Sequence, residues 1–224
     1  MVTNKSIHQG QPILTAGEAP ADTKLNVIML HGRGASAEGL KPLVDALMLP
    51  GLRFHLPQAA RDYWYPQSAF SPIESNQPDL DSALSLLDDL VAALNSTGFD
   101  DQQLCFGGFS QGACLAAEYT ARNARPYAGL FIFSGALIGP EGTPRDYPGD
   151  FAGMPAFIGG SDVDPWVSHD LLKQTARIFQ RMGAEVDFQT YPGMGHTVNQ
   201  DEMDRTRAML SQGLAAASKK PKQL

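Results

Sequence analysis

The sequence predicts an α/β fold in which helices cover both faces of a mostly parallel central sheet. Two observations lead to this prediction. Short apolar runs typical of buried strands mostly end at Gly or Pro, and stretches with helical periodicity lie between most of them. Parallel strands need long crossover connections, and helices of ten or more residues supply them.

Strands are expected where apolar side chains follow one another, over residues 25–30, 53–56, 103–109, 128–133, 155–159 and 185–191. Helical spacing of apolar side chains predicts helices over residues 38–47, 80–95, 111–122, 168–182 and 201–216. Asp79 and Gly98 are the expected caps of the second helix.

The chain is long enough for one domain, since 43% of its 224 residues are hydrophobic, and this domain is expected over residues 25–217. Residues 1–24 are expected to form an N-terminal extension, with a weak edge-strand pattern over residues 11–16. Residues 218–224 are expected to be a disordered tail. The connections 57–78 and 134–154 are too long for simple turns, which favours binding loops, lids or interfaces.

Charge and composition exclude several classes of partner. A net charge of −7 opposes binding to nucleic acids and to anionic membrane surfaces. The polar start of the chain and its lack of a long apolar stretch predict a cytoplasmic protein with no stable membrane association. Cys105 and Cys114 lie in apolar runs and are expected to be buried free thiols. The His and Cys residues lack metal-ligand spacing, so no metal is expected.

The motif Gly108-Phe109-Ser110-Gln111-Gly112 lies between a predicted strand and a predicted helix. This is the context of a nucleophile elbow, a turn so tight that glycine is needed two residues before and after the serine. The motif therefore predicts that Ser110 is a nucleophile.

A serine nucleophile needs a histidine base and an acid that orients the histidine. His196 follows the last predicted strand, whereas His169 lies at the start of a helix, so His196 is the expected base. The loop after residues 155–159 offers Asp162 and Asp164; Asp164 is favoured, because Pro165 makes the adjacent backbone rigid.

The oxyanion of an acyl-transfer reaction needs backbone N–H donors. One is expected from Gln111, directly after the nucleophile, and the other from Arg33, in the glycine-rich turn after the first predicted buried strand. Trp64, Tyr65 and Phe70, in the long loop after the second such strand, are expected to line a substrate pocket or to pin that loop to the core.

Six motifs together resemble the phospholipase/carboxylesterase family of small α/β-hydrolases, which includes bacterial carboxylesterases and acyl-protein thioesterases. The resemblance runs from about residue 25 to residue 204. The motifs are Leu30-His31-Gly32-x-Gly34, Pro57-Gln58-Ala59, Trp64-Tyr65, Gly107-Gly108-Phe109-Ser110-Gln111-Gly112, Asp164-Pro165-x-Val167 and Gly193-Met194-Gly195-His196.

The resemblance implies an α/β-hydrolase fold, a triad of Ser110, Asp164 and His196, oxyanion donors at Arg33 and Gln111, no cofactor, and often a homodimer. The expected activity is that of a serine esterase acting on short- to medium-chain carboxylic esters through an acyl-enzyme, with a lysophospholipase or acyl thioesterase as the alternative. Acyl-protein thioesterases look apolar at the position of Arg33, so its charge argues against long-chain substrates. Arg33 and Arg61 are also weighed as ligands for an anionic substrate group.

Two readings from other classes compete with this one. Gly32-Arg33-Gly34-Ala35-Ser36-Ala37 matches a dinucleotide-binding motif, but the acidic residue expected about 20 positions later is missing. The second competing interpretation is a non-catalytic interaction protein, although such a protein would have no reason to keep a strained elbow and every triad element.

Overall fold

The structure is a computed structural model that describes residues 6–218. Within this range seven strands form one sheet in the order β1-β3-β2-β4-β5-β6-β7. The strand bounds are β1 Ile13–Gly17, β2 Leu25–Leu30, β3 Leu52–Pro57, β4 Leu104–Phe109, β5 Gly129–Phe133, β6 Pro155–Ser161 and β7 Glu185–Tyr191. β1 pairs with β3 in antiparallel register, and the other pairs are parallel, so the predicted mostly parallel sheet is confirmed.

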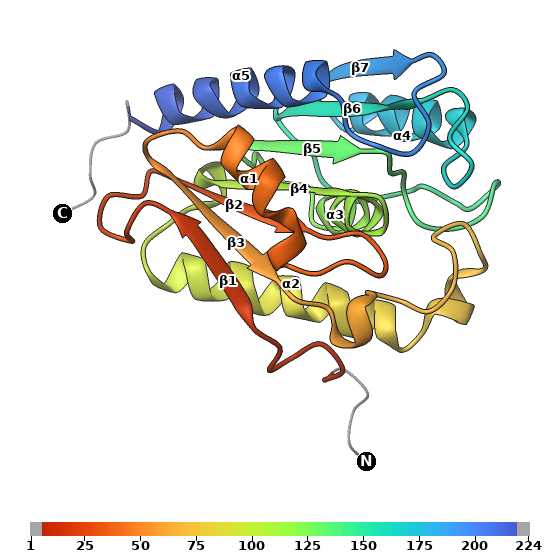
Figure 1. Cartoon of the computed structure of the whole chain (residues 1–224), viewed down its shortest axis with the longest axis horizontal. Helices are drawn as coiled ribbons and strands as arrows, with labels where there is room; N and C mark the ends of the chain where they lie inside the picture. The colour runs from red at the N-terminus through yellow and green to blue at the C-terminus, as the bar shows by residue number, and fades with distance from the viewer. Residues whose placement is uncertain (1–5, 219–224) are drawn as a thin grey trace.

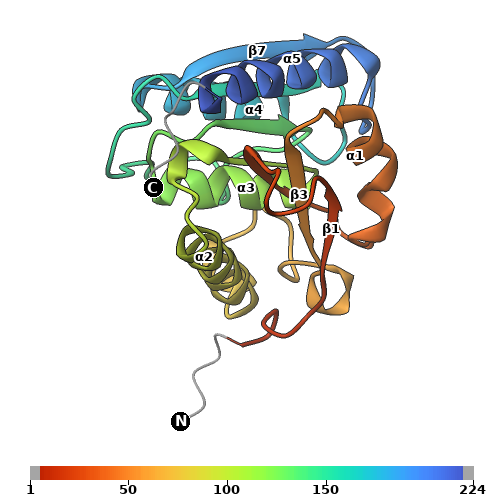
Figure 2. The ribbon, with the colours of Figure 1, turned by 90° about the vertical axis from the view of Figure 1, so that its left-hand side faces the viewer.

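Helices cover both faces of the sheet (Figures 1 and 2). α2 (Asp79–Ser96), α3 (Gln111–Arg122) and α4 (His169–Arg181) lie on one face, and α1 (Lys41–Leu47) and α5 (Gln200–Ala217) lie on the other. Short 3-10 helices occupy Glu38–Leu40, Ala60–Asp62, Ile73–Asn76 and Asp101–Gln103. No helix within residues 6–218 is long and apolar enough to cross a membrane.

Alternate side chains of each central strand enter opposite cores, as strand geometry requires. On β2, Val27 and Met29 pack in the core beneath α1 and α5, whereas Ile28 and Leu30 pack in the core beneath α2 and α3. Both faces of the strand are buried, which explains why the sequence shows a continuous apolar run there and not an alternation.

The predicted strands and helices agree with the structure to within one or two residues at most ends. The edge strand expected over residues 11–16 is confirmed as β1. The expected cap Asp79 is instead the first residue of α2, with Pro78 before it. Cys105 and Cys114 are buried free thiols, as expected. Of the expected tail, residues 219–224 lie outside the described residues.

The long loop over residues 134–154 is tied to α3 by a buried carboxylate. Glu118 is 2% exposed and accepts hydrogen bonds from Arg122 (2.7 Å), the Tyr147 hydroxyl (2.9 Å) and the Ile138 N–H (3.1 Å). Arg145 lies 3.7 Å from the same carboxylate. A buried charge with several donors is stable where an unpaired one is not, so this network fixes the loop against the core.

Candidate active site

The carboxyl ends of the parallel strands meet at one edge of the sheet, where open α/β sheets bind their ligands. The residue pairs Leu30–Gly108, Phe109–Phe133, Phe133–Gly159 and Ser161–Tyr191 bring the ends of β2, β4, β5, β6 and β7 to within about two residues of one another. The loops that follow β4, β6 and β7 carry Ser110, Asp164 and His196.

Ser110 sits on a sharp turn between β4 and α3. Its φ of 56° and ψ of −121° are strained for a residue with a side chain. A Cβ atom at Gly108 would lie 2.6 Å from the Leu30 carbonyl oxygen, and one at Gly112 would overlap the same oxygen. The expected elbow is therefore present, and it needs both glycines because the main chain of β2 passes directly against it.

Ser110, His196 and Asp164 form a continuous chain of hydrogen bonds. His196 Nε2 lies 2.8 Å from Ser110 Oγ, and His196 Nδ1 lies 2.6 Å from Asp164 Oδ2. Asp164 accepts only, so Nδ1 carries a proton and the neutral ring has Nε2 free to accept the serine proton. These are the contacts that an activated serine requires.

The Asp164 carboxylate is held from both sides. Its Oδ1 accepts hydrogen bonds from the backbone N–H groups of Trp166 (2.8 Å) and Val167 (3.1 Å), which leaves Oδ2 for His196. The Asp164 side chain is 1% exposed and that of His196 is 17% exposed. Burial shields the carboxylate, while the imidazole keeps access to a substrate.

The other candidates for the acid and the base, Asp162 and His169, have different contacts. Asp162 accepts a hydrogen bond from the Gly193 N–H (2.8 Å) and so fixes the loop that carries His196. His169 begins α4, and its ring lies 2.8 Å from the Thr190 hydroxyl. Neither contacts Ser110.

Arg33 and Gln111 line the same cavity as Ser110. Gln111 is the first residue of α3, where backbone N–H groups have no partner within the helix and the helix dipole favours negative charge. Arg33 follows Gly32, whose Cβ position would lie 3.3 Å from Ser110 Cβ. The main chain after β2 therefore approaches the serine closely, as an oxyanion donor must.

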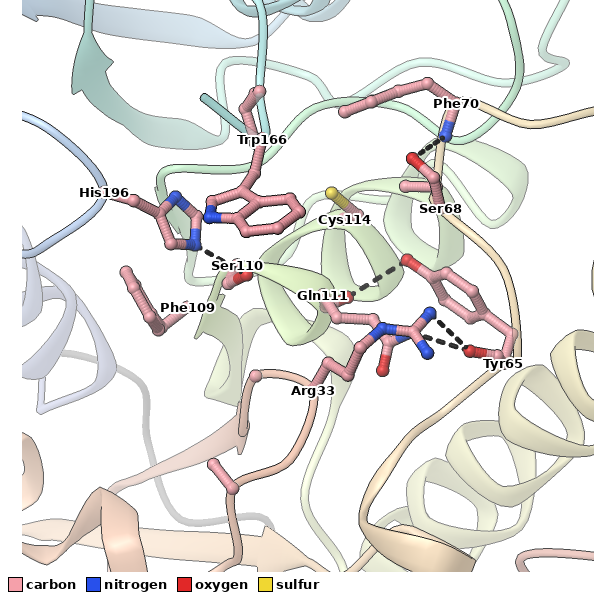
Figure 3. Close-up of a pocket in the computed structure, with 14 residues that line it drawn as sticks. Arg33, Tyr65, Ser68, Phe70, Phe109, Ser110, Gln111, Cys114, Trp166 and His196 are labelled. Atoms are coloured by element: carbon pink, nitrogen blue, oxygen red, sulfur yellow. Dashed lines mark hydrogen bonds between the residues drawn. The ribbon is translucent and has the colours of Figure 1, made fainter. Parts of the chain in front are cut away.

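A cavity of about 470 Å³ opens beside Ser110 and His196 (Figure 3). Most of its wall is apolar or aromatic, with contributions from Tyr65, Ala69, Phe70, Phe109, Cys114, Trp166 and Val167. Tyr65 and Phe70 thus line the cavity as expected.

Trp64 does not line the cavity, which corrects the expectation for this residue. Its side chain is fully buried, and its indole N–H donates to the carbonyl oxygen of His31 (2.8 Å). Of these two neighbouring side chains, only Tyr65 reaches the cavity. Trp64 therefore pins the loop to the core.

The Arg33 guanidinium is also already occupied. It donates to the carbonyl oxygens of Pro66 (2.8 Å), Tyr65 (2.9 Å) and Gln67. The interpretation of Arg33 as a ligand for an anionic substrate group is therefore not supported by its contacts. Arg61 likewise contacts Tyr63 and Asp79.

Sequence reasoning missed two contributions to the site. Trp166 is 70% exposed and lines the cavity together with His196 (Figure 3). The Gln111 side chain accepts from the Trp64 N–H (2.9 Å) and donates to the Tyr65 carbonyl (2.8 Å). The position of Trp166 two residues after Asp164 was a usable signal, but the contacts of the Gln111 side chain depend on tertiary packing.

Comparison with known proteins identifies the family of this chain. Residues 15–213 match the family model described as Phospholipase/Carboxylesterase. The crystal structure of a phospholipase/carboxylesterase from Dyadobacter fermentans DSM 18053 is 41% identical, with a TM-score of 0.86 over 89% of this chain and 96% of that one.

Two curated relatives are more distant. Lysophospholipase-like protein 1 of Mus musculus is 25% identical, over 83% of this chain and 85% of that protein. Acyl-protein thioesterase 1 of Neurospora crassa is 26% identical, over 97% of this chain and 98% of that protein. The chain therefore belongs to the phospholipase/carboxylesterase family, and it is a hydrolase with the α/β-hydrolase fold.

Proposed function

We propose that this hydrolase is a serine esterase that cleaves short- to medium-chain carboxylic esters through an acyl-enzyme, without a cofactor. The observation that carries the proposal is the unbroken chain of hydrogen bonds from Ser110 through His196 to Asp164, at the mouth of an apolar cavity. Catalytic roles follow from the direction of these bonds.

In the first half-reaction, Ser110 Oγ attacks the ester carbonyl while His196 Nε2 takes the serine proton. Negative charge moves to the carbonyl oxygen, where the N–H groups of Gln111 and Arg33 stabilise it. The tetrahedral intermediate collapses, His196 gives its proton to the leaving alcohol, and the acyl group stays on Ser110.

In the second half-reaction, water attacks the acyl-enzyme and His196 takes the proton of that water. The same two N–H groups stabilise the second oxyanion, and the carboxylic acid leaves when Ser110 recovers its proton. Asp164 keeps the imidazole in the required tautomer and stabilises the imidazolium that forms at each step.

The size and lining of the cavity support acyl groups of moderate length. Its volume of about 470 Å³ lies toward the small end of the roughly 300–1,000 Å³ typical of ligand sites. Arg33 contributes a charged residue to a wall that is otherwise largely apolar. A long alkyl chain passing this residue would have to desolvate polar groups, which costs free energy.

A lysophospholipase or acyl thioesterase is the second candidate, because two of the relatives bear those names. The same three side chains serve an oxygen or a sulfur leaving group. Specificity therefore depends on the cavity wall and not on the reacting residues.

The test is hydrolysis of p-nitrophenyl acetate, butyrate, octanoate and palmitate beside matched acyl thioesters, with Ser110→Ala as the control. We expect the highest kcat/KM on the short or medium oxyesters and a loss of about 10⁴-fold or more in kcat for the variant. An optimum on palmitate or on thioesters would favour the second candidate. Retention of a tenth of the wild-type rate by Ser110→Ala would exclude Ser110 as the nucleophile.

A further inference from the structure

His8 lies in the N-terminal segment before β1, outside the cavity, yet it is completely buried. Its ring bridges two points of the loop after β3: His8 Nε2 lies 2.9 Å from the Trp64 carbonyl oxygen, and the Ala60 N–H donates to His8 Nδ1 (3.0 Å). The ring also packs against the Trp64 indole, with centroids 5.6 Å apart. Figure 1 shows the N-terminal segment running beside this loop below the sheet.

These partners define the state of the ring. A backbone N–H can only donate, so Nδ1 accepts, and the proton of the neutral ring is on Nε2, which donates to the Trp64 carbonyl. Burial lowers the pKa of His8 and so favours this neutral form, although Asp79 nearby acts in the opposite direction. The bridge therefore uses both ring nitrogens, one as acceptor and one as donor.

The two residues that follow Ala60 are strained. Arg61 and Asp62 have φ angles of 57° and 58°, a left-handed conformation that residues with side chains rarely adopt twice in succession. Such a conformation costs free energy and persists only where its surroundings impose it. His8 bonds Ala60, directly before these two residues, and Trp64, shortly after them. Its hydrogen bonds are therefore among the contacts that impose the left-handed conformation.

Residues 59–65, here called the clamp segment, contact both residues that supply the proposed oxyanion donors. The Tyr65 carbonyl accepts from the Arg33 guanidinium (2.9 Å), and the Asp62 carbonyl accepts from the N–H of the next residue, Gly34 (2.8 Å). The Gln111 side chain bonds the Trp64 N–H (2.9 Å) and the Tyr65 carbonyl (2.8 Å). Loss of the clamp conformation would therefore disturb both donors together.

His8 has its own anchor, on an element outside the site. The His8 N–H donates to the Ser82 hydroxyl of α2 (2.9 Å), and Gln9 makes two further hydrogen bonds to Ser82. The N-terminal segment is thereby fastened to α2 on one side and to the clamp segment on the other.

From these contacts we infer that His8 is a positioning residue of the oxyanion hole: it holds the clamp segment in the conformation that aligns the Arg33 and Gln111 N–H groups. This inference rests on the proposed oxyanion role of those two groups. It assigns to the N-terminal segment a part in transition-state stabilisation, although no atom of His8 touches the substrate.

The experiment compares three variants with p-nitrophenyl butyrate as the substrate. His8→Phe keeps a buried ring and removes both hydrogen bonds, His8→Asn restores an acceptor near Nδ1, and His8→Gln restores a donor near Nε2. We expect His8→Phe to lower kcat about tenfold or more with KM changed less than about twofold, because an oxyanion donor acts mainly in the transition state. His8→Asn and His8→Gln should each recover part of kcat.

His55→Phe is the matched control. It removes another buried histidine, on β3, whose ring bonds the Asn26 side chain (2.9 Å) and does not line the cavity. We expect it to lower the melting temperature while kcat stays within about twofold of wild type.

Three results would overturn the inference: a folded His8→Phe with kcat within twofold of wild type, a loss confined to KM, or an equal loss of kcat in His55→Phe. If His8→Phe does not fold, wild-type kcat in both His8→Asn and His8→Gln overturns it equally. A wild-type enzyme without Ser110-dependent turnover would instead refute the proposed function, and the inference with it.

Discussion

The two tryptophans of the chain have opposite environments, although both lie close to the site. Trp64 is fully buried and donates to the His31 carbonyl, whereas Trp166 is 70% exposed at the cavity. A buried indole contributes to stability through packing, and an exposed one at a cavity contributes to recognition of a substrate.

We therefore predict that Trp64→Ala destabilises the fold by about 3–5 kcal/mol and leaves the relative rates across acyl lengths unchanged. Trp166→Ala should change the stability by less than about 0.5 kcal/mol and alter those relative rates. Urea unfolding and the p-nitrophenyl ester series measure the two effects. The assignment fails if both variants show the same pattern.

Asp164 offers a test of the hydrogen-bond directions. Its Oδ1 accepts from two backbone N–H groups, so in Asp164→Asn the amide oxygen must stay there and the NH₂ group must face His196. That group would donate to Nδ1, which moves the ring proton to Nε2 and removes the base from Ser110.

We expect Asp164→Asn to lower kcat by about 10⁴-fold, with a melting temperature close to wild type. Asp162→Asn is the control, because Asp162 accepts from the Gly193 N–H in the loop before His196, and kcat of this variant should fall far less. A similar loss in both variants would mean that the loop conformation, and not the tautomer, limits the rate.

At the scale of elements, two glycines inside helices differ in how closely other residues pack against them. Gly112 in α3 lies against the main chain of β2, where a Cβ atom would overlap the Leu30 carbonyl oxygen. Gly213 in α5 has its nearest neighbour, Leu25 Cδ2, at 3.4 Å from the Cβ position. The first glycine permits the close approach of a helix to a strand, and the second leaves room for a methyl group.

Gly112→Ala is therefore predicted to destabilise the protein by about 3 kcal/mol or more, because backbone must move to admit the methyl group. Gly213→Ala should be neutral or stabilising by up to about 1 kcal/mol, since alanine favours the helix. Chemical denaturation of both variants checks the pair, and equal effects would contradict the packing argument.

For the whole molecule, buried ionisable groups set the dependence of stability on pH. Burial lowers the pKa of His55 to about 4 and also lowers the pKa values of His8 and His31. Because the pKa of each of these histidines is lower in the folded state, the unfolded chain binds protons first as the pH falls. Their contribution to the free energy of unfolding is therefore present above about pH 6.5 and is lost as the pH falls toward 4. Glu202 acts in the opposite sense, because burial raises its pKa to about 7 and its contribution is lost as the pH rises from about 4.5 to 7.

Between pH 7 and pH 4, we predict that the free energy of unfolding falls by about 3 kcal/mol less in His55→Phe than in the wild type. Over the same range, the free energy of unfolding of Glu202→Gln should fall by about 3 kcal/mol more than that of the wild type. The variant lacks the carboxyl group whose protonation favours the folded state as the pH falls. Urea unfolding at several pH values measures both slopes. Slopes identical to wild type would show that neither group titrates differently in the folded and unfolded states.

Much of this protein follows from local patterns. The apolar run of β2 predicted its bounds correctly, because burial on both faces leaves a direct mark on the sequence. The bounds of β7 and α3 were also predicted correctly, although β7 is only partly buried and α3 is buried on nearly every side. The elbow was predictable because the close contact with β2 admits only glycine at two positions. Chain order then indicated which acid and which histidine belong with Ser110.

What the sequence determined by itself is therefore the sheet, its helices and the three residues that meet at the strand ends, each of which depends on neighbours in the chain. Only the tertiary structure decided that Trp64 faces the core while Tyr65 faces the cavity, that Arg33 bonds three carbonyls, and that His8 reaches the clamp segment. These contacts join residues about 30 to 60 positions apart. Their geometry depends on loops whose backbone dihedral angles no local pattern specifies, and so it appears only when the whole chain is packed.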